Sequence, residues 1–224
     1  MRSSPRNPRQ PESDEELVGA ALSAYRAGWF PMYMAEEGVV QWVQPRRRSL
    51  IPLDERFAVS RSLRSVVRSG RFMVTSDEAF EAVIRACAVP GRGRESTWLN
   101  EEIVGVFLRF HRAGLAHSVE AWLAGAGGER TLVGGLYGLA LGAIFCGESM
   151  FSRPALGGSN ASKVCLVHLV EHLRQRGFAA LDAQLTNPHL EQFGSHEITQ
   201  REYALLLRKH SGRALGWAPF EVMV

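Results

Sequence analysis

The sequence contains few cysteines, and their placement excludes two ways of stabilising a small fold. Only three cysteines occur among 224 residues, at Cys87, Cys146 and Cys165. An odd number at such wide spacing provides neither a disulfide framework nor a zinc-ligand pattern. This usage is typical of a chain in a reducing cytoplasm. We therefore expect each cysteine to be a small core residue rather than a nucleophile.

Long hydrophobic runs are also missing. The longest apolar stretches are interrupted by glycine and are too short to cross a bilayer, so no membrane contact is expected. The start, MRSSPRNPRQPESDEE, is polar and contains proline, so we expect residues 1–16 to form a mobile tail rather than a secretory signal. A hydrophobic content of 46% is ordinary for a globular chain and is sufficient for one large domain or two small ones.

Lysine is almost absent. Of the 26 basic residues, only Lys163 and Lys209 are lysines and the others are arginines, in a chain of formal net charge +3. Genome composition is one explanation. Arginine also binds phosphate oxygens in a bidentate manner through its planar guanidinium, so a phosphate-bearing ligand is another explanation. Composition alone does not separate these two.

Common catalytic signatures are missing from the sequence. It contains no zinc motif, no serine nucleophile elbow and no dinucleotide fingerprint. The loop RPALGGSNASK leads into an expected helix, but Ser162 stands where a P-loop requires glycine before Lys163. In HSVEAW, His117 and Glu120 fall on opposite faces of a strand, so they are not expected to form an acid–base pair.

Helical periodicity and capping residues predict several helices. They are expected within residues 15–30, 75–88, 100–114, 160–177 and 199–210. Their predicted N-caps include Thr75, Asn100, Asn160 and Thr199. Thr75 and Thr199 are each followed three residues later by glutamate, which predicts capping boxes.

The pattern changes at His117. The segments HSVEAWLA, RTLVGGLYGLA and GAIFCGES are short, apolar and punctuated by glycine, so they predict consecutive antiparallel strands. FAALDAQ predicts a further buried strand after the helix that ends at Gly177. This order of elements predicts an α+β domain over residues 96–224. Residues 17–95 are expected to form a smaller mixed domain.

The segment GESMFSR raises a question about one carboxylate. Glu148 lies between a glycine and the apolar pair Met150 and Phe151, directly after an apolar run. A glutamate at the end of a buried strand is costly unless it is paired or meets a cationic ligand. A structural bond to a neighbouring arginine and a functional role are equally open on spacing alone.

The segment LDAQ places Asp182 and Gln184 two residues apart at a predicted strand end. Strand alternation directs both side chains to the same face. A carboxylate beside a carboxamide is either a polar functional site or a hydrogen-bonded pair that caps the next loop.

An arginine stripe stands out in VSRSLRSVVRSGR. Arg61, Arg64 and Arg68 have helical spacing and would share one face, with Arg71 nearby. Such a face either contacts phosphates or is a solvated surface, and for an isolated stripe the surface interpretation is favoured. The run of arginines at residues 46–48 is expected to add positive charge from a loop.

Two tryptophans are placed beside turn-rich or charged segments. Trp42 and Trp98 are either core aromatics, the commoner outcome, or a platform on which a nucleobase stacks.

Several of these segments occur together in a known order. AYRAGWFPM, SRSLR, TWLNEEI, AHSVEAW, LVGGLYGLALGAIFCGESMFS, NASK and LDAQ make the chain resemble the bacterial leucyl/phenylalanyl-tRNA–protein transferase family over roughly residues 17–208. The resemblance implies an acetyltransferase-like (GNAT) fold for residues 96–224 and a basic face on the smaller domain. It also implies a cytoplasmic monomer with no metal and no bound organic cofactor.

The resemblance further implies an activity. Leucine or phenylalanine, and less well methionine, would move from aminoacyl-tRNA to the α-amine of proteins that begin with Arg or Lys. The modified proteins would then be degraded. The implied catalytic residues are Asp182, Gln184 and Glu148. In one mechanism Asp182 polarises Gln184, which takes a proton from the attacking amine.

The resemblance also implies binding residues. Trp98 would stack on the terminal adenosine of the tRNA, and Arg61, Arg64 and Arg68 would contact the acceptor-stem backbone. The pocket for the leucine or phenylalanine side chain is expected at matching apolar positions: Leu136, Phe145, Met150, Leu166, Leu169, Leu173 and Leu181.

Some positions depart from the family pattern. Met32 replaces a second tryptophan, which weakens the expectation of a two-tryptophan clamp, and Gln44 and Ala183 replace a serine and a cysteine. Two alternatives remain open. One is a non-catalytic module that binds tRNA or N-degrons. The other is a coenzyme A-dependent N-acetyltransferase, although the glycine-rich loop that would hold its pyrophosphate is missing before NASK.

Overall fold

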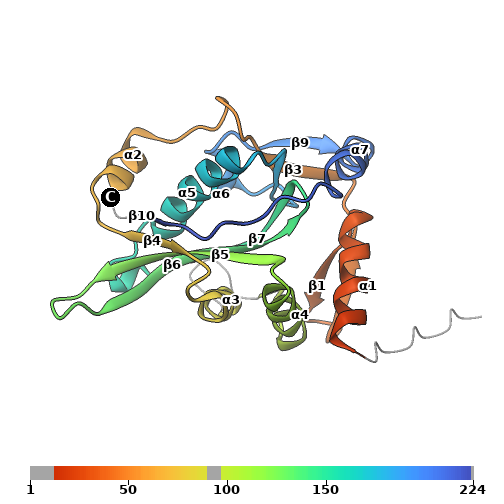
Figure 1. Ribbon diagram of the computed structural model, residues 1–224, viewed down its shortest axis with the longest axis horizontal. Coiled ribbons are helices and arrows are strands. Elements are labelled where there is room, and N and C mark those ends of the chain that lie inside the picture. The colour runs from red at the N-terminus through yellow and green to blue at the C-terminus, as the bar shows by residue number, and fades with distance from the viewer. Residues whose placement is uncertain (1–12, 90–96, 223–224) are drawn as a thin grey trace, which may run out of the picture.

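The computed structural model describes residues 13–89 and 97–222. One eight-stranded mixed sheet forms the centre of the molecule, and a separate two-stranded hairpin lies beside it (Figure 1). The strand order in the sheet is β10-β4-β5-β6-β7-β8-β3-β9. The predicted α+β class is confirmed, whereas the more specific GNAT description stays a prediction.

The sheet is built from strands at both ends of the chain. Its members are β3 (Arg47–Ile51), β4 (Met73–Ser76), β5 (Ala116–Ala124), β6 (Arg130–Leu141), β7 (Ile144–Ser152), β8 (Ala180–Asp182), β9 (His196–Thr199) and β10 (Glu221–Val222). The hairpin consists of β1 (Phe30–Met34) and β2 (Val39–Val43). The region 17–95 therefore contributes β3 and β4 to the same sheet as the later strands. The predicted domain boundaries stay predictions.

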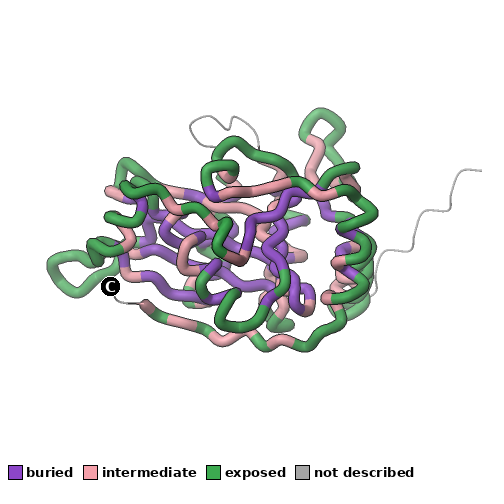
Figure 2. The backbone as a smooth tube through the Cα atoms, turned by 90° about the horizontal axis from the view of Figure 1, so that it is seen from above, coloured by how far each residue is buried: buried purple, intermediate pink, exposed green. Residues whose placement is uncertain are grey.

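Helices cover both faces of this sheet. They are α1 (Asp14–Arg26), α2 (Arg61–Arg68), α3 (Phe80–Ala88), α4 (Glu101–Arg112), α5 (Ala161–Arg176), α6 (Pro188–Glu191) and α7 (Gln200–His210), with a short 3-10 turn at Pro154–Leu156. Helices α3 and α4 lie on one face and α5 on the other (Figure 1). Seen from above, the buried backbone occupies the middle of the molecule and exposed segments surround it (Figure 2).

Two hydrophobic clusters lie on opposite faces of the sheet, because alternate side chains of a strand point to opposite faces. On the face of α3 and α4, Phe107 and Phe110 pack around Tyr137 of β6. On the face of α5, Leu169 and Leu173 pack with Phe145 of β7. The three cysteines are free and buried, in agreement with their predicted role as core residues.

Strand pairing confirms the predicted antiparallel run and shows where it ends. β5, β6 and β7 pair antiparallel in sequence order. β7 then pairs in parallel with β8, but only from Ile144–Cys146 to Ala180–Asp182. After Cys146, β7 continues without β8 beside it. β8 itself ends at Asp182, so the space beside this part of β7 is available for a site.

Most predicted helices are present, with differences at their starts. α4 begins after Asn100, and α7 begins with the predicted capping box of Thr199 and Glu202. The first helix begins earlier than expected, at Asp14, because the Ser13 side chain accepts a hydrogen bond from Glu16 N–H. Of the predicted tail 1–16, residues 1–12 lie outside the described residues.

One predicted cap was wrong, and another has the predicted position without the capping hydrogen bond. Thr75 lies in β4, and α3 begins at Phe80 after Ala79, which has no capping side chain. Glu120 of β5 instead accepts a hydrogen bond from Ala79 N–H at 3.4 Å and another from the Thr75 hydroxyl at 2.8 Å. Asn160 precedes α5 in the left-handed region without a side-chain cap. At the start of α3, a residue distant in the sequence therefore provides the hydrogen-bond acceptor that a neighbouring cap residue was expected to provide.

The basic segment at residues 46–48 was expected to be a loop, but Arg47–Ile51 form β3 between β8 and β9. His117 and Glu120 lie on opposite faces as predicted, since His117 contacts Asp77 at 2.7 Å whereas Glu120 contacts Ser118 and Thr75. No helix among the described residues has the length and apolar character needed to span a membrane.

Candidate active site

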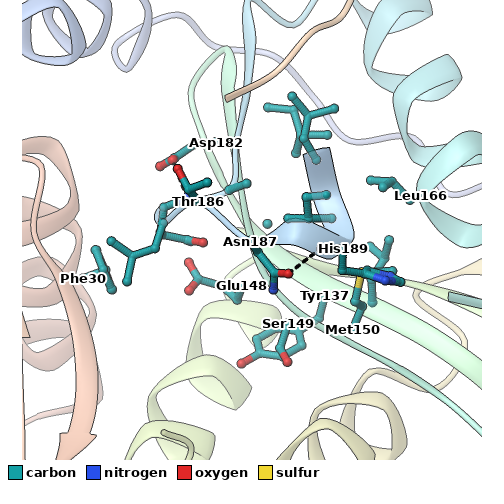
Figure 3. A pocket seen from close by; sticks show the side chains of 18 of the residues that line it. Phe30, Tyr137, Glu148, Ser149, Met150, Leu166, Asp182, Thr186, Asn187 and His189 are labelled. Atoms are coloured by element: carbon teal, nitrogen blue, oxygen red, sulfur yellow. Dashed lines mark hydrogen bonds between the residues drawn. The ribbon is translucent and has the colours of Figure 1, made fainter. Parts of the chain in front are cut away.

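A cavity of about 370 Å³ opens beside β7, at the point where β8 ends. One part of its wall is apolar and consists of Leu136, Met150, Leu166, Leu169, Leu181 and Leu190. The polar part includes Glu148, Asp182, Gln184, Asn187 and His189 (Figure 3). An apolar side chain and a polar reacting group can therefore occupy one cavity side by side.

Glu148 reaches this cavity because β7 carries a bulge. Gly147 lies opposite Gly138 of β6 and Ser149 lies opposite Tyr137, so Glu148 is an extra residue with no partner across the pair. A bulge of this kind bends the strand and redirects a side chain, and it is common beside active sites. The GES motif thus places its carboxylate in the cavity wall.

The Glu148 carboxylate is paired with a tyrosine and not with an arginine. Tyr25 of α1 donates its hydroxyl to Glu148 Oε1 at 3.0 Å. The pKa of Glu148 is raised to about 8, mainly by burial and also by the nearby charge of Asp182, whereas the Tyr25 hydrogen bond and Arg48 oppose the change. The carboxyl therefore titrates near neutral pH.

Asp182 has the opposite environment. Arg48 Nε donates to Asp182 Oδ1 at 2.9 Å and Arg48 Nη2 donates to Oδ2 at 2.7 Å, while the Tyr203 hydroxyl donates to Oδ2 at 2.7 Å. The side chains of Arg48 and Asp182 are 2% and 0% exposed. Asp182 is thus a fully buried carboxylate whose negative charge is matched by an equally buried guanidinium.

Arg48 does not add positive charge to a loop, as the sequence predicted. Its guanidinium lies 4.8 Å from the centre of the Phe30 ring and 4.5 Å from that of Tyr203. Burial lowers the pKa of Arg48, but the charge and hydrogen bonds of Asp182 outweigh this effect and raise it. β3 positions this arginine behind the cavity, under the end of β8.

Gln184 contacts the Asp182 carboxylate through its main chain and not through its side chain. Its N–H donates to Asp182 Oδ1 at 2.9 Å, and its carbonyl accepts from Ser49 N–H at 3.0 Å. The residue has a left-handed φ of 55°, so the chain turns out of the strand there. Gln184 Nε2 is buried and has no hydrogen-bond partner in the described part of the chain. The predicted pair is therefore adjacent, although the carboxylate contacts the main chain of Gln184.

Trp98 lies at the cavity, together with Met32 and Phe30 from the hairpin. Its carbonyl accepts a hydrogen bond from Tyr33 N–H at 3.0 Å, which ties the segment to β1. Trp42 does not line this cavity and instead packs edge-on against Tyr25, with ring centres 6.0 Å apart. Met32, which replaces the second tryptophan of the family pattern, thus forms part of the cavity wall.

The predicted aminoacyl pocket agrees with the cavity at Leu136, Met150, Leu166, Leu169 and Leu181. The structure places Phe145 and Leu173 elsewhere. Both have no exposed surface and belong to the core beneath α5, where Phe145 stacks on Trp217 at 5.4 Å between ring centres. These two side chains support the cavity wall from behind rather than forming it.

The arginine stripe is helical, as predicted. Arg61, Arg64 and Arg68 are exposed on α2 and border a shallow hollow with Ser65 and Ser69. Leu63 is buried on the opposite side of the helix. The three guanidinium groups therefore present one positively charged surface.

Sequence reasoning missed three side chains of the site, namely Tyr25, Arg48 and Tyr203. Tyr25 and Tyr203 lie within predicted helices, where no local motif distinguishes them from core residues. The apolar run that follows Arg48 was a signal for a strand at this position. Within the described residues, no group of three His, Cys, Asp or Glu side chains is arranged to hold a metal ion.

Comparison with family models and named relatives gives matches that carry the same family description. Residues 50–208 match the family model described as leucyl/phenylalanyl-tRNA protein transferase, and residues 18–46 match that of its N-terminal domain. Relatives named leucyl/phenylalanyl-tRNA–protein transferase include one from Chlorobaculum parvum, 52% identical over 83% of this chain and 91% of the relative. Another, from Paramagnetospirillum magneticum, is 50% identical over 81% of this chain and 83% of the relative.

A solved structure adds information about the fold alone. A crystal structure of FemX superposes with a TM-score of 0.54 at 12% sequence identity, covering 84% of this chain and 70% of that chain. The identity is too low for FemX to indicate which substrates bind here.

Proposed function

Because the chain belongs to the leucyl/phenylalanyl-tRNA protein transferase family and is an aminoacyltransferase, we propose that it transfers leucine or phenylalanine to proteins that begin with Arg or Lys. The family predicted from the sequence motifs is confirmed. The observation that supports the finer proposal is the cavity between β7 and β8, in which an apolar wall adjoins the carboxylate of Glu148.

The apolar wall suits the side chain of the transferred amino acid. Leu136, Leu166 and Leu169 come from the sheet and from α5, so the wall is anchored in the core. A wall of this type rejects polar side chains, but it separates residues that differ by one methylene by only about 1–3 kcal/mol. Methionine is accordingly a weaker third substrate in this proposal.

The tRNA would be held in two places. Trp98 would stack on the terminal adenosine, a contact worth about 1–3 kcal/mol per base. Arg61, Arg64 and Arg68 would contact phosphates of the acceptor stem, because their exposed face on α2 matches the requirement for several cations on one surface.

The acceptor would enter on the polar side of the cavity, beside Glu148. Its α-amine attacks the ester carbonyl of the aminoacyl-tRNA, so an amide forms and the ribose oxygen of the tRNA leaves. Holding amine and ester together supplies much of the acceleration, since the ester is already reactive. Asp182 and Gln184 complete this side of the site. We further propose that the enzyme acts as a cytoplasmic monomer and that its products are degraded.

The two alternatives fit the structure less well. For coenzyme A, the first turn of α5 would have to bind a pyrophosphate, but Ser162 N–H already donates to Ser152 Oγ at 3.0 Å. That turn also packs so tightly on β6 that a Cβ at Gly134 would lie 2.4 Å from the Cβ of Ala161. A binding module would not need a titrating carboxylate in its cavity.

The direct test uses two acceptor peptides. Labelled leucyl-tRNA is incubated with the protein and a peptide that begins with Arg, and in parallel with the same peptide beginning with Ala. We expect label in the Arg peptide only. Label in neither peptide, with tRNA binding intact, would favour the binding module.

A further inference from the structure

We propose that Glu148 takes the proton from the acceptor's α-ammonium group, and that Tyr25, Arg48 and Tyr203 are positioning residues that leave this task to Glu148 and not to Asp182. This inference rests on the proposed function and specifies the proton route within the same cavity. It is carried by the contrast between the two carboxylates of the cavity wall (Figure 3).

Asp182 is not free to contact the incoming amine. Its two oxygens receive hydrogen bonds from Arg48, from the Tyr203 hydroxyl and from Gln184 N–H, and the side chain has no exposed surface. Both oxygens are therefore occupied by donors of the protein itself. Asp182 holds Arg48 in place and fixes the backbone turn at Gln184.

A relay through the Gln184 side chain lacks its first contact. Asp182 Oδ1 accepts from the main-chain N–H of Gln184, and the carboxamide itself makes no hydrogen bond through Nε2 to any described residue. A neutral carboxamide is also a very weak base. Its unpartnered N–H is suited to another role, because it can donate to the negative charge that develops on the ester oxygen.

Glu148, unlike Asp182, is accessible from the cavity. It is partly exposed, it lines the cavity, and the Tyr25 hydroxyl holds one of its oxygens in place. The charged and titratable groups near it are Tyr25 of α1, Arg48 of β3, Cys146 of β7 and Asp182 of β8. Its pKa of about 8 is close to that of a free α-amine, also about 8, so proton transfer between the two is nearly balanced.

The proposed step balances as follows. The α-ammonium group transfers one proton to the Glu148 carboxylate, and the neutral amine attacks the ester carbon. The new C–N bond forms, the C–O bond to the terminal ribose breaks, and the second proton lost by the nitrogen goes to the leaving ribose oxygen. Protonated Glu148 then releases its proton to solvent.

The test uses a pair of acceptors that differ in charge at the nucleophile. One peptide begins with ordinary Arg, and the other carries an α-hydroxyamino group in place of the α-amine, which is largely uncharged at neutral pH. Single-turnover transfer from leucyl-tRNA is measured for the wild type, Glu148→Gln and Asp182→Asn. We expect Glu148→Gln to slow transfer to the ordinary peptide by about 10²-fold or more while keeping most of the wild-type rate with the hydroxyamino peptide. Asp182→Asn should impair both.

A second variant tests the positioning role. Tyr25→Phe removes the hydrogen bond that favours ionised Glu148, so the rising limb of the rate–pH profile should move to higher pH. The proposal would be overturned if Glu148→Gln lowered the transfer rate equally with both peptides. It would also be overturned if Glu148→Gln changed only the preference for the Arg peptide over the Ala peptide, or if Tyr25→Phe left the rate–pH profile unchanged. Failure of the wild type with every peptide would instead refute the proposed function.

Discussion

Arg48 and Asp182 form a buried, bidentate ion pair across 134 residues of sequence, with Nη2 of the arginine 2.7 Å from Oδ2 of the aspartate. The pair joins β3 to the end of β8 beneath the cavity, and Tyr203 of α7 adds a hydrogen bond to the same carboxylate. A segment from the first quarter of the chain is therefore part of the frame of the site.

Breaking this pair should destabilise the protein. Arg48→Met leaves the buried Asp182 side chain without its partner, which should lower the free energy of unfolding by about 3–5 kcal/mol in urea denaturation. The double variant Arg48→Met with Asp182→Leu should recover much of the loss. Arg47→Met is the matched control, because Arg47 pairs with Glu197 at the surface and its side chain is 60% exposed, so its effect should stay within about 1 kcal/mol. Equal effects at positions 47 and 48 would contradict the structural role of the pair.

Local patterns predicted much of the fold and brought the main site residues to attention. Alternation and glycine spacing predicted β5, β6 and β7 in order, and Asn100 and Thr199 predicted the starts of α4 and α7. The GES and LDAQ motifs contain two carboxylates that the structure brings into one cavity wall. Each of these features depends on a few neighbouring residues, so a short segment of sequence is sufficient to predict it.

What the sequence did not predict depends on distant partners. Arg48 was read as loop charge because its partner Asp182 is far away in the chain. The start of α3 was misplaced because its N-terminal N–H bonds to Glu120 of β5, not to a nearby cap. The direction of the Glu148 side chain depends on a bulge, which appears only when β7 is paired with β6. Such contacts exist only in the folded chain.

Glu148 should make stability fall with rising pH. Its folded pKa of about 8 lies above the ordinary 4.5, so the folded state binds more protons than the unfolded state between these values. Stability from this group is full at low pH and is lost as the pH rises towards 8. Glu148→Gln removes the titration, so its stability relative to the wild type should increase from pH 5.5 to pH 8.5 in thermal unfolding.

The control for that measurement is Glu197→Gln. The pKa of Glu197 is lowered by hydrogen bonds from Thr186 and Arg47, so its contribution is lost only below its ordinary pKa, outside the same pH range. A constant difference between Glu148→Gln and the wild type across that range would show that the Glu148 carboxyl is not perturbed by burial.

Gly138 should be irreplaceable in the bulged pair. A Cβ at this position would lie 2.3 Å from the carbonyl oxygen of Cys146 and 2.4 Å from Cε1 of Phe145. Gly138→Ala should therefore lower the free energy of unfolding by about 1–3 kcal/mol and reduce transfer, since the bulge that directs Glu148 adjoins it. Gly19→Ala in α1 is the control, because nothing lies within 4 Å and alanine should be neutral or stabilising by about 0.5–1 kcal/mol. Gly138→Ala with wild-type stability would show that β6 and β7 adjust freely there.

The arginine surface of α2 should determine how tRNA binding responds to salt. Arg61→Ala combined with Arg64→Ala removes two expected phosphate contacts, so each loss should reduce the slope of log affinity against log salt by about 1. Binding is measured by filter retention of leucyl-tRNA at several salt concentrations, with thermal unfolding as the check on folding. Arg112→Ala at the end of α4 is the control, because this exposed arginine lies on the other face of the sheet and should leave the slope unchanged. A double variant with the wild-type slope would show that these arginines form a solvated surface and that the tRNA backbone binds elsewhere.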